Sequence, residues 1–272
     1  MSAAPSLEVR HLVKHFPLGG GLFGRQRNVV RAVDGVSFDV GRGETLGVVG
    51  ESGCGKSTLG KVVMKLLEPT GGRILLGGAD VTHLDARAMW RHRRQIQLVF
   101  QDPYSSLNPR LSAGAIVGEP LENFGLARGR EKDERVAQLF RRVGLRPEAM
   151  RKYPHEFSGG QRQRLGIAKA LAVNPDVIVA DEPVSALDVS VQAQVLELID
   201  DVRKRFNLAV LFITHDLRVA AQVCDRIAVM HRGEVVEEGT TAAVFAAPKH
   251  DYTRALFDSA PGKNFEFGKF EN

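Results

Sequence analysis

The segment 50–58, GESGCGKST, limits what this chain can fold into more than any other part of its sequence. It follows a nearly continuous apolar run and opens a stretch of helical spacing. Gly50, Gly55, Lys56 and Ser57 fill the pattern G-x-x-x-x-G-K-[ST]. Glycines let the backbone fold tightly around phosphate oxygens, and the N-terminus of the next helix adds partial positive charge. We therefore expect a strand–loop–helix unit that binds nucleotide phosphates.

Individual side chains of this loop have expected roles. Lys56 supplies a full charge for the β- and γ-phosphates, and the Ser57 hydroxyl is a Mg²⁺ ligand. Cys54 lies beside a helix N-terminus, where the pKa of a thiol can fall, but we favour a tolerated small residue over a redox role. The predicted nucleotide-binding residues of the loop are Gly50, Glu51, Ser52, Gly53, Cys54, Gly55, Lys56, Ser57 and Thr58.

Two adjacent acids end a second apolar run, VIVADEP, which contains Asp181 and Glu182. Asp181 would hold Mg²⁺ mostly through water, because Mg²⁺ gives up its hydration reluctantly. Glu182 is placed to take a proton from the attacking water. The loop and the acids together predict a nucleoside triphosphatase that works with Mg²⁺.

Strands and helices alternate along the chain. Apolar, β-branched runs predict strands at 7–13, 30–40, 45–50, 73–77, 96–100, 177–181, 209–214, 226–230 and 233–237. Helical spacing follows residue 57 and recurs at 115–127, 132–143, 160–172, 190–205 and 216–223, and it is lost after Pro248. The runs 45–50, 177–181 and 209–214 are typical of parallel strands covered on both faces. We expect an α/β domain with a helical insertion at about 102–160.

Composition leaves the class of partner open. Lys and Arg total 37 against 32 Asp and Glu, which suits either nucleic acid or an anionic membrane surface. Two distant cysteines, Cys54 and Cys224, exclude a disulfide scaffold and fit a reducing compartment. The longest strongly apolar run, 208–214, is too short to span a membrane.

The segment HEFSGGQRQRLGIAKAL resembles a known family. Its residues Ser158, Gly159, Gly160 and Gln161 match the signature motif of ATP-binding cassette (ABC) ATPases. A glycine pair, a helix N-terminus and a serine hydroxyl again make an anion cradle. Since the chain already has one phosphate-binding loop, the second cradle makes sense if it serves a partner chain's nucleotide. The other motifs follow in order, with Gln101 in VFQDP, Asp188 in SALD and His215 in FITHD.

The resemblance implies a role for each of these residues. The glutamine matching Gln101 meets Mg²⁺ and the attacking water, and begins a segment, 102–112, that touches membrane subunits. The histidine matching His215 contacts the γ-phosphate, and the aspartate matching Asp188 lies at a dimer seam. Phe16 matches the aromatic residue on which adenine stacks, with a core position in the first hairpin as the alternative. The implied catalytic residues are Glu182, His215 and Gln101, and the implied metal ligands are Ser57, Gln101 and Asp181.

Longer segments, such as FQDPYSSLNPR and DEPVSALDVSVQAQVLELI, resemble the oligopeptide/dipeptide importer branch of the family. The resemblance implies a P-loop NTPase fold with a RecA-like core, an N-terminal antiparallel β-subdomain and an inserted α-helical signature subdomain. It divides the chain into an ATPase domain, 1–245, and a peptide-importer-type extension, 246–272. Asp251 stands in the extension where proline is usual.

The same resemblance implies partners and a location. The chain would pair with a second ABC ATPase subunit, identical or homologous, and work with two transmembrane permease subunits and an extracytoplasmic solute-binding protein. It would bind ATP and Mg²⁺ at the cytoplasmic face of the cell (inner) membrane and drive uptake of peptides or related solutes. Similar subunits serve nickel, glutathione, opines and sugars, so the solute stays open.

Two other classes fit part of the pattern. Some ABC ATPases act on nucleic acids, and arginines cluster here at 91–94, 141–142 and 203–205. A solvated helical face explains these clusters better, and the interval from Gln101 to Ser158 has no room for long coiled coils. We therefore expect no nucleic-acid partner. A small P-loop kinase would not need the signature motif.

Overall fold

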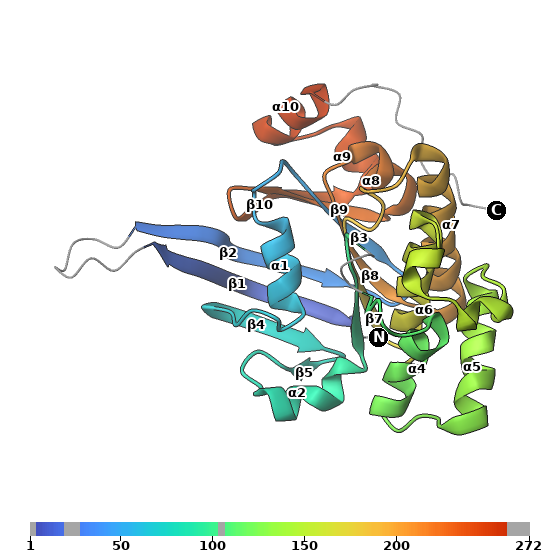
Figure 1. Cartoon of the computed structure of the whole chain (residues 1–272). Helices are drawn as coiled ribbons and strands as arrows, with labels where there is room; N and C mark the ends of the chain where they lie inside the picture. The colour runs from blue at the N-terminus through green and yellow to red at the C-terminus, as the bar shows by residue number, and fades with distance from the viewer. Residues whose placement is uncertain (1–3, 19–27, 103–106, 260–272) are drawn as a thin grey trace. The chain divides into compact units, whose positions relative to one another are not determined.

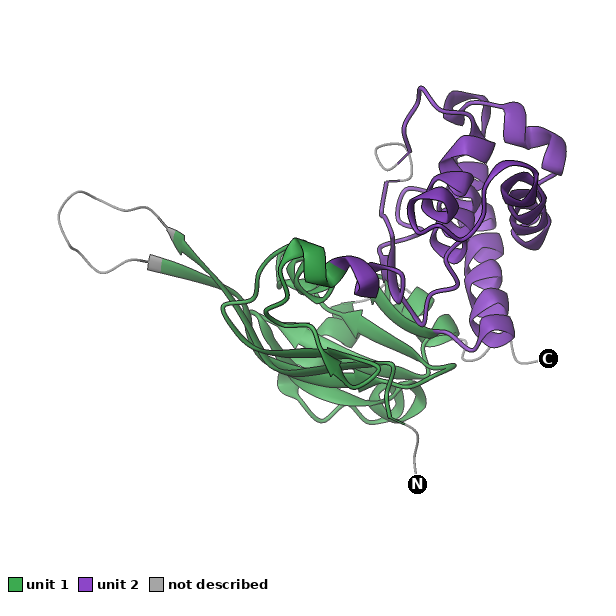
Figure 2. Cartoon of the chain, turned by 90° about the horizontal axis from the view of Figure 1, so that it is seen from below, with its two compact units in different colours: residues 1–89, 209–272 green, residues 90–208 purple. Residues whose placement is uncertain are grey.

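The chain divides into two compact units (Figure 2). The computed structural model describes residues 4–18, 28–102 and 107–259. Unit 1 comprises residues 1–89 and 209–272, and unit 2 comprises residues 90–208.

The predicted helical insertion, 102–160, lies within the longer unit 2. The division into an ATPase domain and an extension after residue 245 stays a prediction. The glycine-rich segment 17–28 lies mostly, and the tail 262–272 wholly, outside the described residues.

An antiparallel sheet forms the N-terminal part of unit 1, as expected. Its strands in spatial order are β2 (Asn28–Val40), β1 (Leu7–Leu18), β4 (Gly71–Leu76) and β5 (Ala79–Asp80). Alternate residues of β1 turn inward, so Leu7 and Val9 are buried. The first hairpin is longer than predicted because its pairing continues to Leu18 and Asn28.

A second group of strands carries the phosphate-binding loop. β3 (Thr45–Val49) pairs in parallel with β8 (Ala209–Thr214) and β9 (Arg226–His231), and β10 (Glu234–Thr240) pairs antiparallel with β9. Every residue of β3 and β8 is buried, which confirms the prediction of parallel strands covered on both faces. Val49 pairs with Thr214, so the phosphate-binding loop and His215 leave the strands at the same edge.

The helices of unit 1 include some that the sequence analysis missed. The helices of this unit are α1 (Lys56–Val63), α8 (Leu217–Val223), α9 (Thr241–Ala246) and α10 (Asp251–Ser259); α2 (Ala86–Arg93) lies at the unit boundary (Figure 1). The sequence analysis left the order of the chain after Pro248 open, and α10 forms there. Its Phe257 is buried and stacks on Phe245 of α9, with ring centroids 4.5 Å apart.

Unit 2 combines two strands with a group of helices. β6 (Ile96–Val99) pairs in parallel with β7 (Val177–Asp181). The α-helices are α4 (Ala113–Asn123), α5 (Gly129–Arg142), α6 (Gly159–Leu171) and α7 (Val189–Phe206), and the short 3₁₀ helices are η1 (Pro147–Arg151) and η2 (Pro154–Glu156). Apolar side chains at helical spacing, such as Ile116, Val136 and Phe140, form the buried core among these helices.

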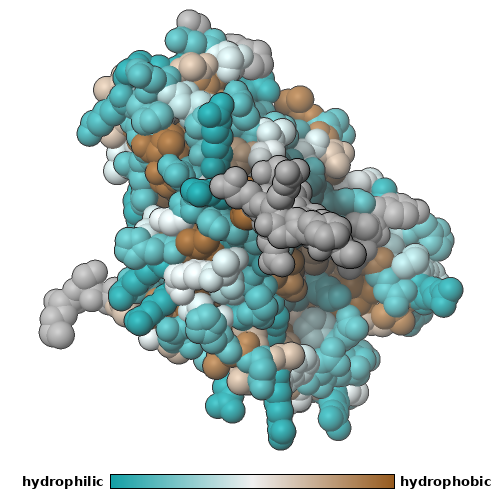
Figure 3. Space-filling model, turned by 90° about the vertical axis from the view of Figure 1, so that its left-hand side faces the viewer, coloured by the Kyte–Doolittle hydropathy of each residue, from teal (hydrophilic) through white to brown (hydrophobic). Residues whose placement is uncertain are grey.

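On the face in Figure 3, hydrophilic residues predominate and hydrophobic ones form small separate groups. Among the described residues, no helix is long and apolar enough to cross a membrane.

Candidate active site

The loop before α1 has the geometry of an anion cradle. Gly55 caps α1 in a left-handed conformation, with φ at 113°, and no side chain caps this helix end. A Cβ on Gly55 would lie 2.0 Å from the carbonyl oxygen of Ala32, so only glycine fits there. Because no side chain caps this end of α1, its first backbone N–H groups are donors that suit a phosphate group.

Lys56 is held at the loop rather than extended into solvent. Its ammonium donates hydrogen bonds to the carbonyl oxygens of Gly50, at 2.7 Å, and Glu51, at 2.8 Å. The residue is only 5% exposed. The buried Lys56 ammonium and the N-terminus of α1 together provide positive charge and hydrogen-bond donors. This arrangement fits the negative charge of a triphosphate.

Cys54 has an environment opposite to that of a reactive thiol. Burial raises its pKa, although the nearby Lys56 ammonium opposes this rise. The Sγ atom lies 3.8 Å from Lys56 Nζ. The lowered pKa considered for this thiol is therefore wrong, and a small residue that fits the loop is the better interpretation.

His215 follows β8 and is exposed at the edge where the loop begins. The next residue, Asp216, caps α8 by accepting a hydrogen bond from the backbone N–H of Arg218 at 2.9 Å. Burial acts to raise the pKa of Asp216, but its hydrogen bonds with Arg218 outweigh burial and lower it. This charged cap fixes the chain directly after His215.

Phe16 lies in the first hairpin, paired with Val30 of β2. Ala32, whose carbonyl approaches Gly55, is two residues further along β2. The Phe16 ring is half-buried, and the Lys14 ammonium lies 4.9 Å from its centroid. The ring is therefore not fully buried in the core, and one of its faces is in contact with a cation.

In unit 2, the parallel pairing of β6 and β7 brings two predicted catalytic residues together. Val99 pairs with Ala180, so Gln101 and Glu182 follow neighbouring strand ends. The Gln101 side-chain amide donates a hydrogen bond to Glu182 Oε2 at 3.1 Å. Asp181, the last residue of β7, comes directly before Glu182 in the sequence and is half-buried.

The backbone at Glu182 is strained. Its φ is 47°, the left-handed region that non-glycine residues rarely adopt. The turn that follows holds it there, because the Ser185 hydroxyl donates to the Glu182 carbonyl oxygen at 3.1 Å. Strain of this kind concentrates at functional positions, where the surrounding structure fixes a side chain in place.

The signature segment forms the N-terminus of α6. Ser158 Oγ accepts from the backbone N–H of Gln161 at 3.3 Å, and Gln161 Oε1 accepts from the backbone N–H of Ser158 at 3.0 Å. A Cβ on Gly160 would lie 2.2 Å from Val191 Cγ1 of α7. Glycine is therefore required at Gly160 for the two helices to pack, and Gly159 beside it is half-buried.

Asp188 caps the neighbouring helix, α7. Its carboxylate accepts from the Ser190 hydroxyl at 2.8 Å and from the backbone N–H of Val191 at 3.1 Å. The hydrogen bond from Ser190, followed by that from Val191, lowers the pKa of Asp188. Asp188 is exposed and charged at neutral pH, next to the signature segment through the contact of Val191 with Gly160.

The structure thus brings the predicted residues together in two sets. Unit 1 joins the phosphate-binding loop with His215, and places Phe16 on the hairpin that contacts the loop. Unit 2 joins Gln101 with Glu182, and the signature segment with the start of α7. Their assembly into one catalytic site stays a prediction.

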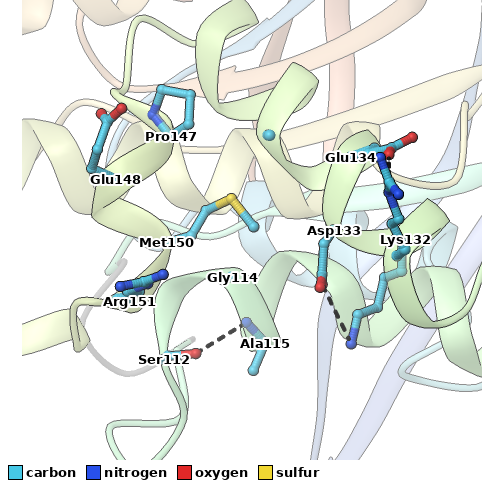
Figure 4. Close-up of a pocket in the computed structure, with 12 residues that line it drawn as sticks. Ser112, Gly114, Ala115, Lys132, Asp133, Glu134, Pro147, Glu148, Met150 and Arg151 are labelled. Atoms are coloured by element: carbon cyan, nitrogen blue, oxygen red, sulfur yellow. Dashed lines mark hydrogen bonds and ion pairs between the residues drawn. The ribbon is translucent and has the colours of Figure 1, made fainter.

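A pocket of about 930 Å³ lies within unit 2 and contains none of the predicted site residues. The start of α4, α5 and η1 surround it (Figure 4). Its charged lining residues are Arg130, Lys132, Asp133, Glu134, Glu148 and Arg151. Ser112, the N-cap of α4, lies at its edge and ends the segment expected to touch membrane subunits.

The comparisons with known proteins agree with the geometry. Residues 33–185, more than half of the chain, match the family model described as ABC transporter. The chain belongs to this family. The probable peptide ABC transporter ATP-binding protein y4tS of Sinorhizobium fredii is 53% identical over 94% of this chain and 72% of its own length. The oligopeptide transport ATP-binding protein AppF of Bacillus subtilis is 50% identical over 94% of this chain and 78% of its own.

A solved structure confirms the expected ABC fold. The ATP-binding cassette MJ0796, described as a dimer in a post-hydrolysis state bound to ADP and Pi, superposes with a TM-score of 0.75. It is 30% identical to this chain, and the match covers 86% of this chain and 98% of that one. The chain is thus an ABC ATPase with a P-loop NTPase fold.

The sequence analysis missed residues of this ABC ATPase that contact the phosphate-binding loop. Gly233, in the turn between β9 and β10, donates its N–H to the Cys54 carbonyl oxygen at 2.9 Å. Tyr252 of α10 accepts a hydrogen bond from the backbone N–H of Glu51 at 3.2 Å. A helix prediction over DYTRALF would have drawn attention to Tyr252, but its contact needs the tertiary structure.

Proposed function

We propose that this chain is the ATP-binding and ATP-hydrolysing subunit of an importer that takes up di- and oligopeptides or related small solutes. The names of the two relatives reported above support peptide transport. The hydrogen bond between Gln101 and Glu182 carries the hydrolytic part of the proposal, because it orients a carboxylate next to the end of β7. A structural turn would not need a strained glutamate at that point.

Unit 1 binds the nucleotide. The N–H groups from Gly55 onward and the Lys56 ammonium bind the β- and γ-phosphates, and the Phe16 ring stacks on adenine. His215 contacts the γ-phosphate from the end of β8. These groups bind ATP in one orientation, with its γ-phosphate at Lys56 and His215.

Glu182 acts as the general base. It accepts a proton from water while the water oxygen attacks the γ-phosphorus, and the bond to the ADP oxygen breaks. Lys56 offsets the charge that develops on the phosphate oxygens. Ser57, Gln101 and Asp181 would hold Mg²⁺, an oxygen-ligand set that suits this ion and would further neutralise phosphate charge.

A head-to-tail pair of ABC ATPase subunits completes each site. Ser158 and Gly160 of one subunit bind the γ-phosphate held by the other, and Asp188 lies at the seam. The Ser158 oxygen caps α6 as an acceptor, so its O–H remains a donor for phosphate. Bound ATP holds the two subunits together through this phosphate, and its hydrolysis allows the subunits to separate.

Membrane partners supply the translocation path. Two transmembrane permease subunits contact the segment 102–112, which lies partly outside the described residues, at the cytoplasmic face of the membrane. An extracytoplasmic solute-binding protein delivers the solute. The pocket that begins at Ser112 places charged side chains of both signs beside this contact segment.

Vesicles that contain the permease subunits test this function. Addition of the wild-type chain and MgATP to the cytoplasmic side should give uptake of a labelled oligopeptide, with release of phosphate and no phosphorylated product. The Lys56→Ala chain is the matched negative control. ATP hydrolysis unaffected by the permeases, together with salt-sensitive binding to DNA or RNA, would contradict an importer.

A further inference from the structure

Helix α10 contacts the phosphate-binding loop through Tyr252. The Tyr252 hydroxyl oxygen accepts a hydrogen bond from the backbone N–H of Glu51 at 3.2 Å. The carbonyl oxygen of the same Glu51 accepts a hydrogen bond from Lys56 Nζ at 2.8 Å. One residue of the loop therefore connects α10 with the lysine that binds phosphate.

Rigid neighbours hold Tyr252 in place. Its ring packs against the ring of His231, at the end of β9, with centroids 3.8 Å apart. The Glu237 carboxylate of β10 accepts hydrogen bonds from the backbone N–H groups of Lys249, at 2.8 Å, and His250, at 3.0 Å. Buried Phe257 fixes the other end of α10. The hydroxyl is thus presented by a packed helix, not by a loose tail.

The end of β9 and the turn that follows it also contact the loop. The Gly233 N–H donates to the Cys54 carbonyl oxygen at 2.9 Å, and the Met230 carbonyl oxygen lies 2.2 Å from where a Cβ on Gly50 would be. Neither this turn nor Tyr252 uses the N–H groups that open α1. Their contacts leave the phosphate-binding donors available to the nucleotide.

We propose that Tyr252 is a positioning residue for the phosphate-binding loop: its hydroxyl accepts the Glu51 N–H and holds the loop in the conformation that binds ATP. The C-terminal helix thereby sets nucleotide affinity without touching the nucleotide. Without the hydroxyl, the loop spends part of its time in conformations that bind ATP poorly. The apparent affinity for ATP then falls in proportion to the fraction of chains whose loop is in the binding conformation.

Titration of the purified chain with a fluorescent ATP analogue tests this role. Tyr252→Phe removes the hydroxyl and keeps the ring on His231. Loss of one neutral hydrogen bond predicts a Kd about two- to tenfold higher for ATP and for ADP alike. The number of sites per chain should not change, whereas a variant that merely unfolds in part would lose sites and keep its Kd.

Two further variants complete the experiment. Tyr153→Phe removes a hydroxyl from an exposed tyrosine of unit 2 and should bind like the wild type. Lys56→Ala should lose binding, which shows that the signal comes from the phosphate-binding loop. A Kd for Tyr252→Phe equal to that of the wild type, while Lys56→Ala fails to bind, would overturn the role of Tyr252 and leave the proposed ATPase function intact.

Discussion

The Gln101 amide donates a hydrogen bond to Glu182 Oε2 at 3.1 Å, across two parallel strand ends. This bond restrains the carboxylate of a residue whose backbone is already strained, with φ at 47°. A restrained side chain and an unusual backbone conformation at the same residue indicate that the orientation of Glu182 matters. In the mechanism proposed above, that orientation directs a carboxylate oxygen toward the attacking water.

Gln101→Ala should therefore slow hydrolysis more than it weakens ATP binding. A base displaced by about 1 Å costs up to about 100-fold in rate, so we expect kcat to fall between about tenfold and 100-fold. Phosphate release at saturating ATP gives kcat, and nucleotide titration gives Kd. Gln97→Ala is the control, because Gln97 lies in β6, just before Gln101, and its side-chain amide donates to the Arg93 carbonyl oxygen of α2. Equal rates in both variants would contradict the role of Gln101.

Phe16→Ala tests the adenine contact. Loss of stacking on a base costs about 1–3 kcal/mol, so the Kd for ATP should rise by about five- to 150-fold. Inhibition by inorganic triphosphate, which has no base to stack, should stay at the wild-type value. Phe16→Tyr should restore ATP binding. Equal losses for ATP and triphosphate would show that Phe16 supports the hairpin instead.

Mixing two inactive variants tests the head-to-tail pairing. Lys56→Ala lacks a working phosphate-binding loop, and Ser158→Arg blocks the signature surface with a large cation. In an identical pair, a mixed dimer has one site built from the intact loop of one chain and the intact signature of the other. The mixture should recover hydrolysis that neither variant shows alone. No recovery, in a mixture shown to form dimers, would contradict shared sites.

Cys54 should react slowly with alkylating reagents. Because burial raises the pKa of this thiol, the reactive thiolate is scarce at neutral pH and increases only in alkaline solution. At about pH 7.5, labelling of the folded chain should be at least about tenfold slower than labelling of the urea-unfolded chain. Peptide mass spectrometry measures the labelling of Cys54 and of the second buried thiol, Cys224, in the same sample.

ATP should slow the labelling of Cys54 further and leave that of Cys224 unchanged. Fast labelling of Cys54 in the folded chain at neutral pH, with no increase at alkaline pH, would contradict the effect of burial on its pKa.

Sequence alone predicted the features that depend on local pattern. The strand 209–214 has the bounds expected of it, because it is a continuous apolar run that begins just after Asn207, in a left-handed turn, and ends at polar His215. The phosphate-binding loop was predictable for the same reason, since its glycines and Lys56 are close together in the chain.

The features that sequence did not predict depend on distant contacts. Helix α10 is short, and it is stabilised by the packing of Phe257 on Phe245 and by the Glu237 carboxylate. The bonds from Gln101 to Glu182 and from Glu51 to Tyr252 join residues far apart in sequence, and each requires the strand register or helix packing of the folded unit. The short elements β5 and α2 bury too few side chains to produce a clear period.

The rate of phosphate release by the Glu182→Gln chain tests the central claim most directly. The replacement keeps the size of the side chain and an oxygen that can accept from Gln101, but it removes the base. Loss of a general base costs about 100- to 10,000-fold, so hydrolysis should fall by at least about 100-fold while ATP still binds and holds two subunits together. Hydrolysis at the wild-type rate would contradict the assignment of Glu182 as the base.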